Sequence, residues 1–344
     1  MNLTASRHIL PIANYLDRRG EPLEPLLLRA GLPATCLDDP QKLMPTAALW
    51  RFRELAADRT GDPNLTFSVI KPLALNELGR VAKTLLRAPT LKKAIQTFAR
   101  LTYVESTTAH IQLTPYRAGE TFLSVQFTLG RVRGEWQAEL YLLMWLLKIV
   151  GIADPDFSPK EVWCMECATP DRRRIIESLG ARARFNQQMV GFPIPTPMLA
   201  LPIHRTEAGR SPGVAEDELW STAPSDSASG ALRQLIKAYS DDRWLSLSEA
   251  SDALGISGRG LQRNLAAEAT TFSTVLEGAR AELARDLLME TDLSLTGIAR
   301  RLGYSSLSNF NRAFQRWAAV LPSEYRVGSR TANASRAAPH RDPS

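Results

Sequence analysis

Residues 294–326 read SLTGIARRLGYSSLSNFNRAFQRWAAVLPSEYR, and this stretch decides the fold of the C-terminal part of the chain. Apolar residues at helical spacing predict a short helix over Thr296–Leu302 and a second helix over Ser306–Trp317. Gly303 and Tyr304 stand between them as a turn. A helix, a short turn with glycine and a second helix are typical of the helix-turn-helix motif, which places its second helix in the major groove of DNA.

The second of these helices has two chemically different faces. Apolar residues recur at positions i, i+3, i+4 and i+7 and are predicted to form its buried stripe: Phe310, Ala313, Phe314 and Trp317. The same spacing on another face holds polar side chains: Ser308, Asn311, Arg312 and Gln315. Each of these four can form hydrogen bonds with base edges or phosphates. The face left in solvent is therefore chemically suited to DNA.

The segment Leu247–Ala267 repeats this design earlier in the chain. A helix is predicted over Ser246–Leu254, where Ser246 and Glu249 are spaced as a capping box, and a second helix over Gly258–Ala267. The predicted inward side chains of the second helix are Leu261 and Leu265, and the outward ones are Arg259, Gln262 and Arg263. Any surface helix carries a polar stripe, so one copy would decide little. Two copies with no acidic residue on the outward face favour DNA recognition.

Two further helices complete the predicted all-α C-terminal domain. One covers Ala231–Ser240, ahead of the first motif. The other is a long amphipathic helix over Phe272–Met289, which connects the two motifs. The sequence thus predicts a dual helix-turn-helix domain held together by one connecting helix.

Residues 244–326 resemble the DNA-binding domain of AraC/XylS-type transcription regulators. The order and spacing of these residues carry the resemblance: Ile298-Ala299, Leu302-Gly303-Tyr304, Phe310, Arg312-Ala313-Phe314, Trp317, Pro322 and Tyr325-Arg326. The resemblance implies a set of base-reading positions: Arg259, Gln262, Arg263, Leu307, Ser308, Asn311 and Arg312. Since Leu307 cannot form hydrogen bonds, we expect at most a contact with a thymine methyl group there.

Three positions depart from the pattern of that family. Gly297 stands where the family usually has an acidic residue, and Ala269 stands where it usually has glycine. The segment Ala319–Leu321 replaces the usual Gly-x-Ser before Pro322. We expect these departures to loosen the second motif and the loops locally while the fold is kept.

The N-terminal part resembles, more weakly, the arabinose-binding-type effector domain found in one branch of the same family. Four short segments and one single residue carry this resemblance: Arg29–Pro33, Gly61–Leu65, Ala183–Phe185, Val190–Phe192 and Leu199. The name of that domain transfers no ligand, and the sequence leaves the effector-binding residues unknown. Trp136, Trp145 and Trp163 could line a ligand pocket, although core packing is the default for aromatic residues.

The N-terminal part is predicted to be of the α+β class. Its predicted elements are helices over Leu43–Arg59, Leu91–Ala99, Glu135–Val150 and Asp171–Leu179, a hairpin of His110–Thr114 with Phe122–Thr128, and a strand over Val162–Cys167. Glu135–Val150 is apolar on nearly all sides, which indicates a central buried helix.

The length of 344 residues favours two domains. We predict an α+β effector or oligomerisation domain over residues 1–204 and a linker, rich in Gly, Ser, Pro and acidic residues, over 205–230. A short helical turn is expected within that linker, around 214–220. The dual helix-turn-helix domain follows over 231–328, and residues 329–344 are predicted to be a disordered tail.

Composition and charge exclude several classes of protein. The net charge is +6, a mild attraction for polyanions. The longest wholly apolar run, Leu140–Leu147, is far shorter than the roughly 20 residues that a membrane-spanning helix needs. The first residues lack the apolar stretch of a secretory signal, and three cysteines cannot form a disulfide framework. We therefore expect a cytoplasmic protein with no membrane partner.

Enzymatic motifs and metal motifs find little support. No glycine-rich phosphate loop, HExxH or GxSxG pattern is present, so we expect no enzyme, no catalytic residue and no cofactor. Cys164 and Cys167 have CxxC spacing, but a structural zinc site needs four ligands and the histidines are not at motif spacing. No metal site is therefore expected. The alternative reading is a DNA repair or modifying protein that uses Cys164 and Cys167 beside an AraC-like DNA-binding domain.

The resemblance and the faces of the helices together predict a sequence-specific transcription regulator, most simply an activator. Its expected partners are double-stranded promoter DNA, RNA polymerase, an unidentified small-molecule effector and a second copy of the chain in a homodimer.

Overall fold

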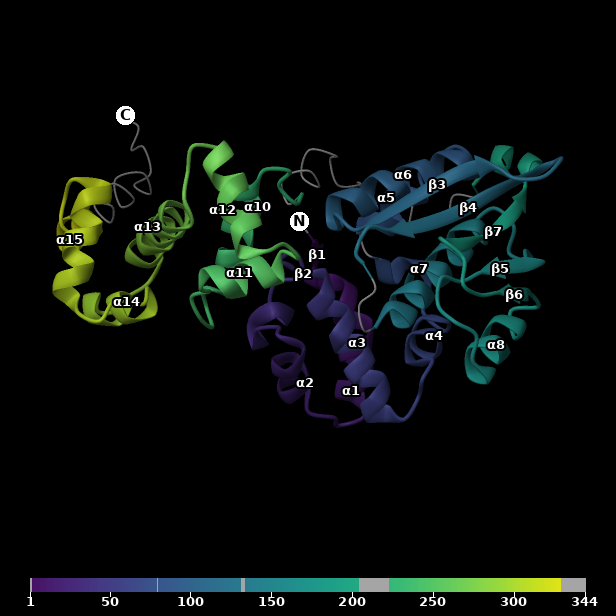
Figure 1. Cartoon of the computed structure of the whole chain (residues 1–344), viewed down its shortest axis with the longest axis horizontal. Helices are drawn as coiled ribbons and strands as arrows, with labels where there is room; N and C mark the ends of the chain where they lie inside the picture. Colours follow the sequence, from purple (N-terminus) through teal and green to yellow (C-terminus); the bar gives the residue numbers. More distant parts are fainter. Residues whose placement is uncertain (1, 79, 131–133, 204–222, 329–344) are drawn as a thin grey trace, which may run out of the picture. The chain divides into compact units, whose positions relative to one another are not determined.

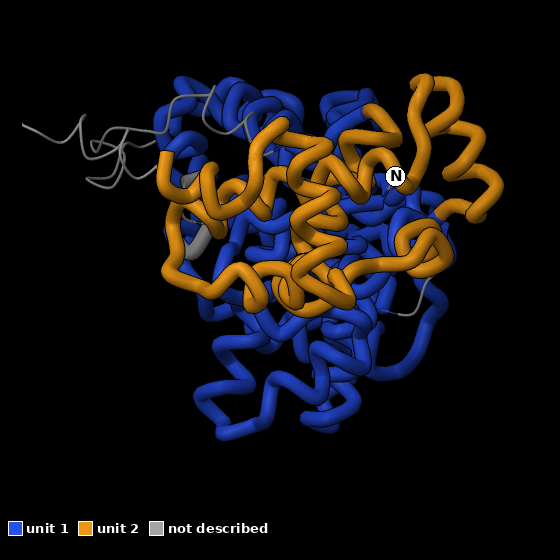
Figure 2. The backbone as a smooth tube through the Cα atoms, turned by 90° about the vertical axis from the view of Figure 1, so that its left-hand side faces the viewer, with its two compact units in different colours: residues 1–226, 253–255 blue, residues 227–252, 256–344 orange. Residues whose placement is uncertain are grey.

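The computed structural model describes residues 2–78, 80–130, 134–203 and 223–328 (Figure 1). Most of the predicted linker, with its helical turn around 214–220, and the predicted tail 329–344 lie outside the described residues. The chain divides into two compact units, coloured separately in Figure 2. The N-terminal unit is Met1–Asp226 with Ala253–Gly255, and the C-terminal unit is Ser227–Asp252 with Ile256–Ser344.

A five-stranded sheet organises the N-terminal unit (Figure 1). Its strands are β3 (Ala109–Pro115), β4 (Glu120–Phe127), β5 (Glu161–Trp163), β6 (Arg182–Arg184) and β7 (Val190–Pro195), in the spatial order β3-β4-β7-β5-β6. β3 and β4 pair antiparallel, which confirms the predicted hairpin. β5 and β6 are parallel, and every other neighbouring pair is antiparallel.

The predicted strand Val162–Cys167 is too long at its C-terminal end. β5 ends at Trp163, and the chain then leaves the sheet. The buried carboxylate of Glu139 accepts the backbone N–H groups of Met165 and Glu166, both at 2.9 Å. Because these N–H groups bond to a side chain, they are not available to a sheet neighbour.

Helices complete the N-terminal unit, and some of them contact the sheet. They are α1 (Leu10–Arg18), α2 (Leu23–Ala30), α3 (Thr46–Thr60), α4 (Leu65–Ile70), α5 (Arg80–Leu85), α6 (Leu91–Glu105), α7 (Glu135–Val150) and α8 (Pro170–Glu177). The buried helix α7 has the predicted bounds and packs against α3 and α4, while α6 packs against β3. The prediction of one helix over Leu43–Arg59 is wrong at its start. Residues Leu43–Pro45 form strand β2, which pairs with β1 (Leu3–Ala5).

The C-terminal unit is helical, as predicted. Its helices are α10 (Ala228–Tyr239), α11 (Leu247–Ala253), α12 (Gly258–Ala267), α13 (Phe272–Glu290), α14 (Leu295–Arg301) and α15 (Leu307–Ala318). α10 begins three residues earlier than predicted, inside the proposed linker. Glu268 explains this start, because its carboxylate accepts the backbone N–H groups of Ala228 and Ser229 at the helix N-terminus.

Side chains close the N-termini of the short helices in this unit. Ser246 and Glu249 form the predicted capping box, with Ser246 N–H donating to Glu249 Oε2 at 2.8 Å and Glu249 N–H donating to Ser246 Oγ at 3.3 Å. Ser257 and Ser306 accept backbone N–H groups at the starts of α12 and α15. These caps fix the residue at which α12 and α15, the second helices of the two motifs, begin.

The second motif folds around an aromatic cluster. Phe310 and Phe314 are fully buried against Leu288 of α13, Ile298 of α14 and Leu302, which directly follows α14. Trp317 is half-buried at the edge of this cluster, and its ring centroid lies 6.3 Å from those of Tyr304 and Phe314. The stripe predicted from helical spacing is therefore the packing face of α15.

Two of the three departures from the family pattern adopt left-handed backbone conformations. Ala269 has φ of 54° and Ala319 has φ of 59°. A side chain at Cβ costs about 1–2 kcal/mol in this region, and glycine avoids the cost. At Gly297, α14 keeps its cap, since Ser294 Oγ accepts the Gly297 N–H at 3.1 Å. The strain thus lies at the ends of α12 and α15, beyond the helices themselves.

We expect Ala269→Gly and Ala319→Gly each to raise the free energy of unfolding by about 1 kcal/mol, because glycine relieves the left-handed strain. Chemical denaturation of the full chain measures the change. Ala266→Gly, at an exposed helical position of α12, is the control and should lower stability by roughly 0.5–1 kcal/mol. A loss of stability in both glycine variants at 269 and 319 would contradict the assigned strain.

We expect Trp317→Ala to lower the free energy of unfolding by about 3 kcal/mol, since it removes aromatic packing and leaves a cavity. Gln315→Ala, at an exposed position of the same helix, should stay within about 0.5 kcal/mol of wild type. A Trp317→Ala protein with unchanged melting temperature and reduced DNA affinity would show that the tryptophan contacts DNA instead.

Candidate nucleic-acid interface

The first recognition helix, α12, separates its buried and exposed faces as the sequence predicts. Leu261 and Leu265 are fully buried. The outward side chains are all exposed: Arg259, Gln262 and Arg263. Within the part of the chain that the structure describes, neither arginine forms an ion pair with a carboxylate. These two guanidinium groups keep all their donors for an external anion.

The second recognition helix, α15, presents a more mixed face. Ser308, Arg312 and Gln315 are exposed. Asn311 is half-buried, and its Oδ1 atom is buried with no hydrogen-bond partner among the described residues. Leu307 is half-buried and packs against the aromatic cluster. Part of the Leu307 side chain is therefore used in packing, although the family pattern places this residue among the base-reading positions.

Asn309 is a residue that the sequence reasoning missed. Its Oδ1 accepts a hydrogen bond from Arg312 Nη2 at 2.6 Å, and its Nδ2 donates to Ser305 Oγ at 3.1 Å. Asn309 therefore holds the Arg312 guanidinium on the outward side of α15. The i, i+3 spacing of the two residues was the available signal, since side chains three positions apart are neighbours on a helix.

A compact set of contacts ties the loop before α11 to the second motif. Trp244 Nε1 donates to the backbone carbonyl of Arg301 at 2.9 Å, and Arg301 forms an ion pair with Asp241 at 2.7 Å. The Arg280 guanidinium of α13 lies 4.9 Å from the ring centroid of Trp244 and 5.5 Å from that of Tyr304. The two motifs are thus connected by this cluster as well as by α13.

Gly303 makes the close approach in this cluster possible. Its φ is +78°, and a Cβ atom at this position would lie 3.0 Å from Trp244 Cδ1 and 3.2 Å from Arg280 Nη2. Both the turn and the packing therefore require glycine.

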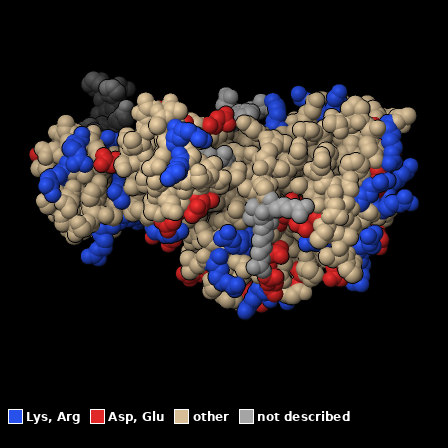
Figure 3. Space-filling model, in the orientation of Figure 1, with Lys and Arg blue, Asp and Glu red and all other residues tan. Residues whose placement is uncertain are grey.

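Lys and Arg side chains on the face shown in Figure 3 are spread among neutral and acidic ones and do not merge into one continuous basic surface. The C-terminal region is correspondingly poor in lysine, with Lys237 as the one lysine after residue 230 in the sequence.

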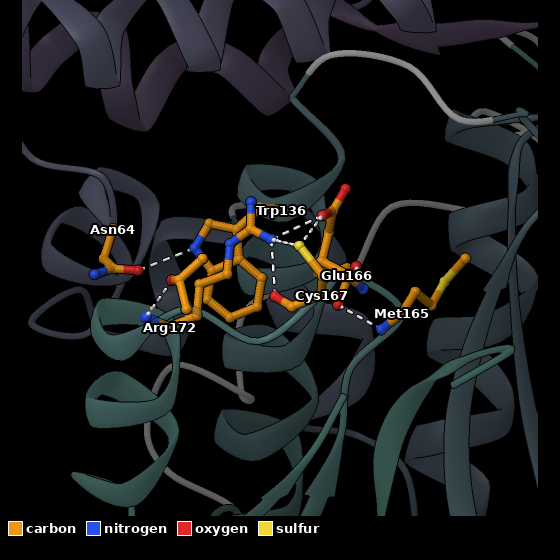
Figure 4. A network of polar contacts seen from close by, with 8 residues as sticks. Asn64, Trp136, Met165, Glu166, Cys167 and Arg172 are labelled. Carbon is orange, nitrogen blue, oxygen red and sulfur yellow. Dashed lines mark hydrogen bonds and ion pairs between the residues drawn. The ribbon is translucent and has the colours of Figure 1, made fainter. Parts of the chain in front are cut away.

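Cys164 and Cys167 lie in different surroundings. Cys164 is buried, and burial raises the pKa of its thiol, which disfavours the reactive thiolate. Cys167 is exposed, with its Sγ 3.5 Å from Arg172 Nη1 (Figure 4). Among the described residues, no three His, Cys, Asp or Glu side chains form a group that could hold a metal ion.

No helix in the described part of the chain is long and apolar enough to cross a membrane.

Two family models match the chain. A helix-turn-helix domain matches residues 250–327. The arabinose-binding domain of AraC transcription regulators matches residues 20–203, which is more than half of the chain.

Curated relatives are transcription regulators. The ornithine utilization regulator of Pseudomonas aeruginosa is 34% identical over 157 residues, which cover 45% of this chain and 46% of that protein. An uncharacterised HTH-type transcriptional regulator of Mycobacterium tuberculosis is 24% identical over 93% of this chain and 94% of that protein. The virulence regulon transcriptional activator VirF of Shigella flexneri is 30% identical over 30% of this chain and 40% of that protein. The first and third matches span less than half of those relatives.

The family models follow the two units of the structure, with the arabinose-binding model on the N-terminal one and the helix-turn-helix model on the C-terminal one. The AraC-type model covers more than half of the chain, and the relatives are regulators of the same kind. The chain therefore belongs to the AraC family of transcription regulators.

Proposed function

We propose that α12 and α15 enter successive major grooves of a promoter site and that their outward side chains read its sequence. The observation that carries this proposal is the pair of exposed polar faces, both free of acidic residues and both held within one unit. The proposed DNA contacts are Arg259, Gln262 and Arg263 of α12 and Leu307, Ser308, Asn311 and Arg312 of α15.

The length of α13 supports simultaneous binding of both motifs. Its 19 residues give a helix of about 28 Å at 1.5 Å per residue. Successive major-groove segments on one face of DNA lie about 34 Å apart. The helix and the width of each motif together can span that distance. Because the Trp244 cluster adds a second connection, the DNA must bend toward the protein or engage one motif less fully.

The two motifs are expected to contribute unequally. α12 offers two arginines without acidic partners, whereas on α15 Leu307 packs inward and Arg312 already bonds to Asn309. We therefore propose that α12 supplies more of the specific affinity and α15 more of the positioning.

The wider role in transcription is part of the same proposal. The N-terminal unit responds to a small-molecule effector and supports a homodimer, and the bound protein activates transcription by contacting RNA polymerase in the cytoplasm. The activating direction is supported by the name of the relative VirF, a transcriptional activator. We further propose that residues 1–204 form the effector domain, that residues 231–328 form the DNA-binding domain and that residues 329–344 form a tail.

We expect the substitutions Arg263→Ala and Arg312→Ala each to weaken specific DNA binding. A bidentate contact with guanine predicts a loss of about 1–3 kcal/mol for the specific site. A phosphate contact predicts equal weakening on all sequences and a salt dependence reduced by about one ion. Electrophoretic mobility shift across a salt series measures both.

The matched control is Arg316→Ala. This arginine lies on the same helix but faces Glu277 of α13 at 3.7 Å, so its loss should leave operator affinity within about twofold of wild type. Unchanged affinity in both the Arg263 and Arg312 variants would contradict the assigned interface.

An operator with five base pairs inserted between its two half-elements tests the spacing. Half a helical turn moves one element to the opposite face of the duplex, since one turn holds roughly 10 base pairs. We expect DNase footprinting to show protection of one half only, with the α12 half retained. A ten-base-pair insertion is the control for added length. Full protection of both halves after the five-base-pair insertion would show that the two motifs are not rigidly spaced.

A further inference from the structure

Two adjoining cavities lie inside the N-terminal unit, and His8 and Tyr141 border both of them. The inner cavity measures about 40 Å³ and is bordered by Arg53 of α3. The outer cavity measures about 260 Å³. The terms inner and outer denote the smaller and the larger cavity, and the two residues that border both are in contact, with His8 Nδ1 3.0 Å from the Tyr141 hydroxyl.

Arg53 is a buried cation that forms no ion pair with a carboxylate of the described residues. Its side chain is 4% exposed. Its Nη2 donates to the backbone carbonyl of His8 at 2.8 Å, and the guanidinium lies 4.2 Å from the ring centroid of Tyr141. Its Nε is buried and has no hydrogen-bond partner in the described structure. Burial lowers the pKa of Arg53 to about 10, so the side chain remains charged at neutral pH.

The nearby carboxylate does not neutralise this charge. Glu105 is engaged by two other residues, with Arg7 Nη1 and His8 Nε2 each 3.0 Å from its oxygens. Burial alone would raise the pKa of Glu105, but the hydrogen bond from His8 and the charge of Arg7 outweigh it and lower that pKa. Glu105 is therefore ionised and already has partners. The positive charge of Arg53 is not balanced by this carboxylate. An uncompensated charge in the protein interior is costly, which favours an anion beside it.

Hydroxyl groups of Thr4, Ser106 and Thr108 border the inner cavity, and Thr46 bonds to Thr4 behind them. Four hydroxyl groups form a chain of three hydrogen bonds, at 2.7, 2.8 and 3.0 Å: Thr46, Thr4, Ser106 and Thr108. Three bonds use three of the four hydroxyl protons, so one O–H group remains to donate. No acidic residue borders this cavity among the described residues. Its polar lining therefore offers donors and a positive charge.

The outer cavity is suited to the body of a small ligand. Its lining is partly apolar, with Leu10, Pro11, Leu73, Val81 and Trp145. Its polar border includes Asn14, Arg18 and the ion pair of Arg7 with Glu105, in which the Glu105 carboxylate is already paired. Together the two cavities reach the lower end of the size range of ligand pockets, roughly 300 Å³. This space suits a small metabolite and is too small for a nucleotide or a lipid chain.

We propose that these adjoining cavities are the effector site and that the effector is a small carboxylic acid whose carboxylate pairs with Arg53. The inference rests on the proposed function, in which an effector acts through the N-terminal unit. The body of the ligand lies in the outer cavity, and its path to Arg53 passes the contact between His8 and Tyr141. Parting that contact on binding couples ligand occupancy to the position of the first residues of the chain.

A larger groove of about 460 Å³ beside Trp136 is a weaker candidate because its key polar groups already have partners. Arg172 Nη1 lies 2.7 Å from Glu166 Oε2, and Trp136 Nε1 donates to Asn64 Oδ1 at 2.9 Å (Figure 4). Arg172 also lies over the Trp136 ring, 5.1 Å from its centroid. This network is complete without a ligand.

The test is direct binding to the full chain without DNA. The probes are unbranched mono- and dicarboxylates of two to eight carbons and the α-amino acids, each compared with its primary amide. We expect at least one carboxylate to raise the melting temperature while its amide does not, and calorimetry then gives the affinity. If no carboxylate raises the melting temperature, or if an amide acts as well as its acid, the proposal is overturned.

Two variants on α3 identify the residue responsible. Arg53→Met should weaken carboxylate binding on the order of thirtyfold or more, because it removes the buried partner of the charge. Arg51→Met removes the same charge from an exposed position on the same helix and should leave the affinity unchanged. Equal binding by Arg53→Met and wild type would overturn the assignment. The comparison of acid with amide uses the wild-type chain, so it stands even where Arg53→Met fails to fold.

A mobility-shift measurement on the same preparation without probe keeps this inference separate from the proposed function. Operator binding without carboxylate binding overturns the effector site alone. Carboxylate binding without operator binding overturns the proposed DNA recognition and leaves the effector site in place.

Discussion

The burial of Phe310 and Phe314 against α13 and α14 fixes the orientation of α15, and through it the direction in which Arg312 extends. A helix turns about 100° per residue, so residues at i, i+3, i+4 and i+7 share one face and the remaining positions face elsewhere. Burying each phenylalanine contributes roughly 1.5–3 kcal/mol. That energy holds the polar face in solvent, since any rotation of the helix would expose aromatic rings.

The same constraint acts on α12 with smaller side chains. Leu261 and Leu265 alone provide its fully buried residues, and the helix depends in addition on its cap at Ser257. The first motif has no aromatic cluster of this kind. Trp244, in the loop before α11, adds stabilising contacts to Arg301 and Arg280. These contacts hold α12, which packs through leucines, and α15, which packs through aromatic residues, within one unit.

In the N-terminal unit the governing constraint is the cost of charge in a medium of low dielectric. Arg7, His8, Arg53 and Glu105 converge where α3, α6 and the first residues of the chain meet, and Glu105 contacts Arg7 and His8 but forms no ion pair with Arg53 among the described residues. The protein retains a buried guanidinium that hydrophobic residues of similar volume could replace at little or no cost in stability. The cavity beside this guanidinium is the space for which a carboxylate ligand is proposed.

The sequence by itself determined the helices of the C-terminal unit, the capping box at Ser246, the hairpin of β3 and β4 and the buried helix α7. These features depend on periodicity and on neighbours within a few residues, which a sequence displays directly. Tertiary structure alone decided that Leu43–Pro45 pair as a strand and that β5 stops where Glu139 takes over the N–H groups of Met165 and Glu166. It alone brought Arg53 beside Tyr141, where the guanidinium pairs with the aromatic ring and a backbone carbonyl. The physical reason is that such contacts join residues tens of positions apart, and their energy depends on which side chains the folded chain encloses together.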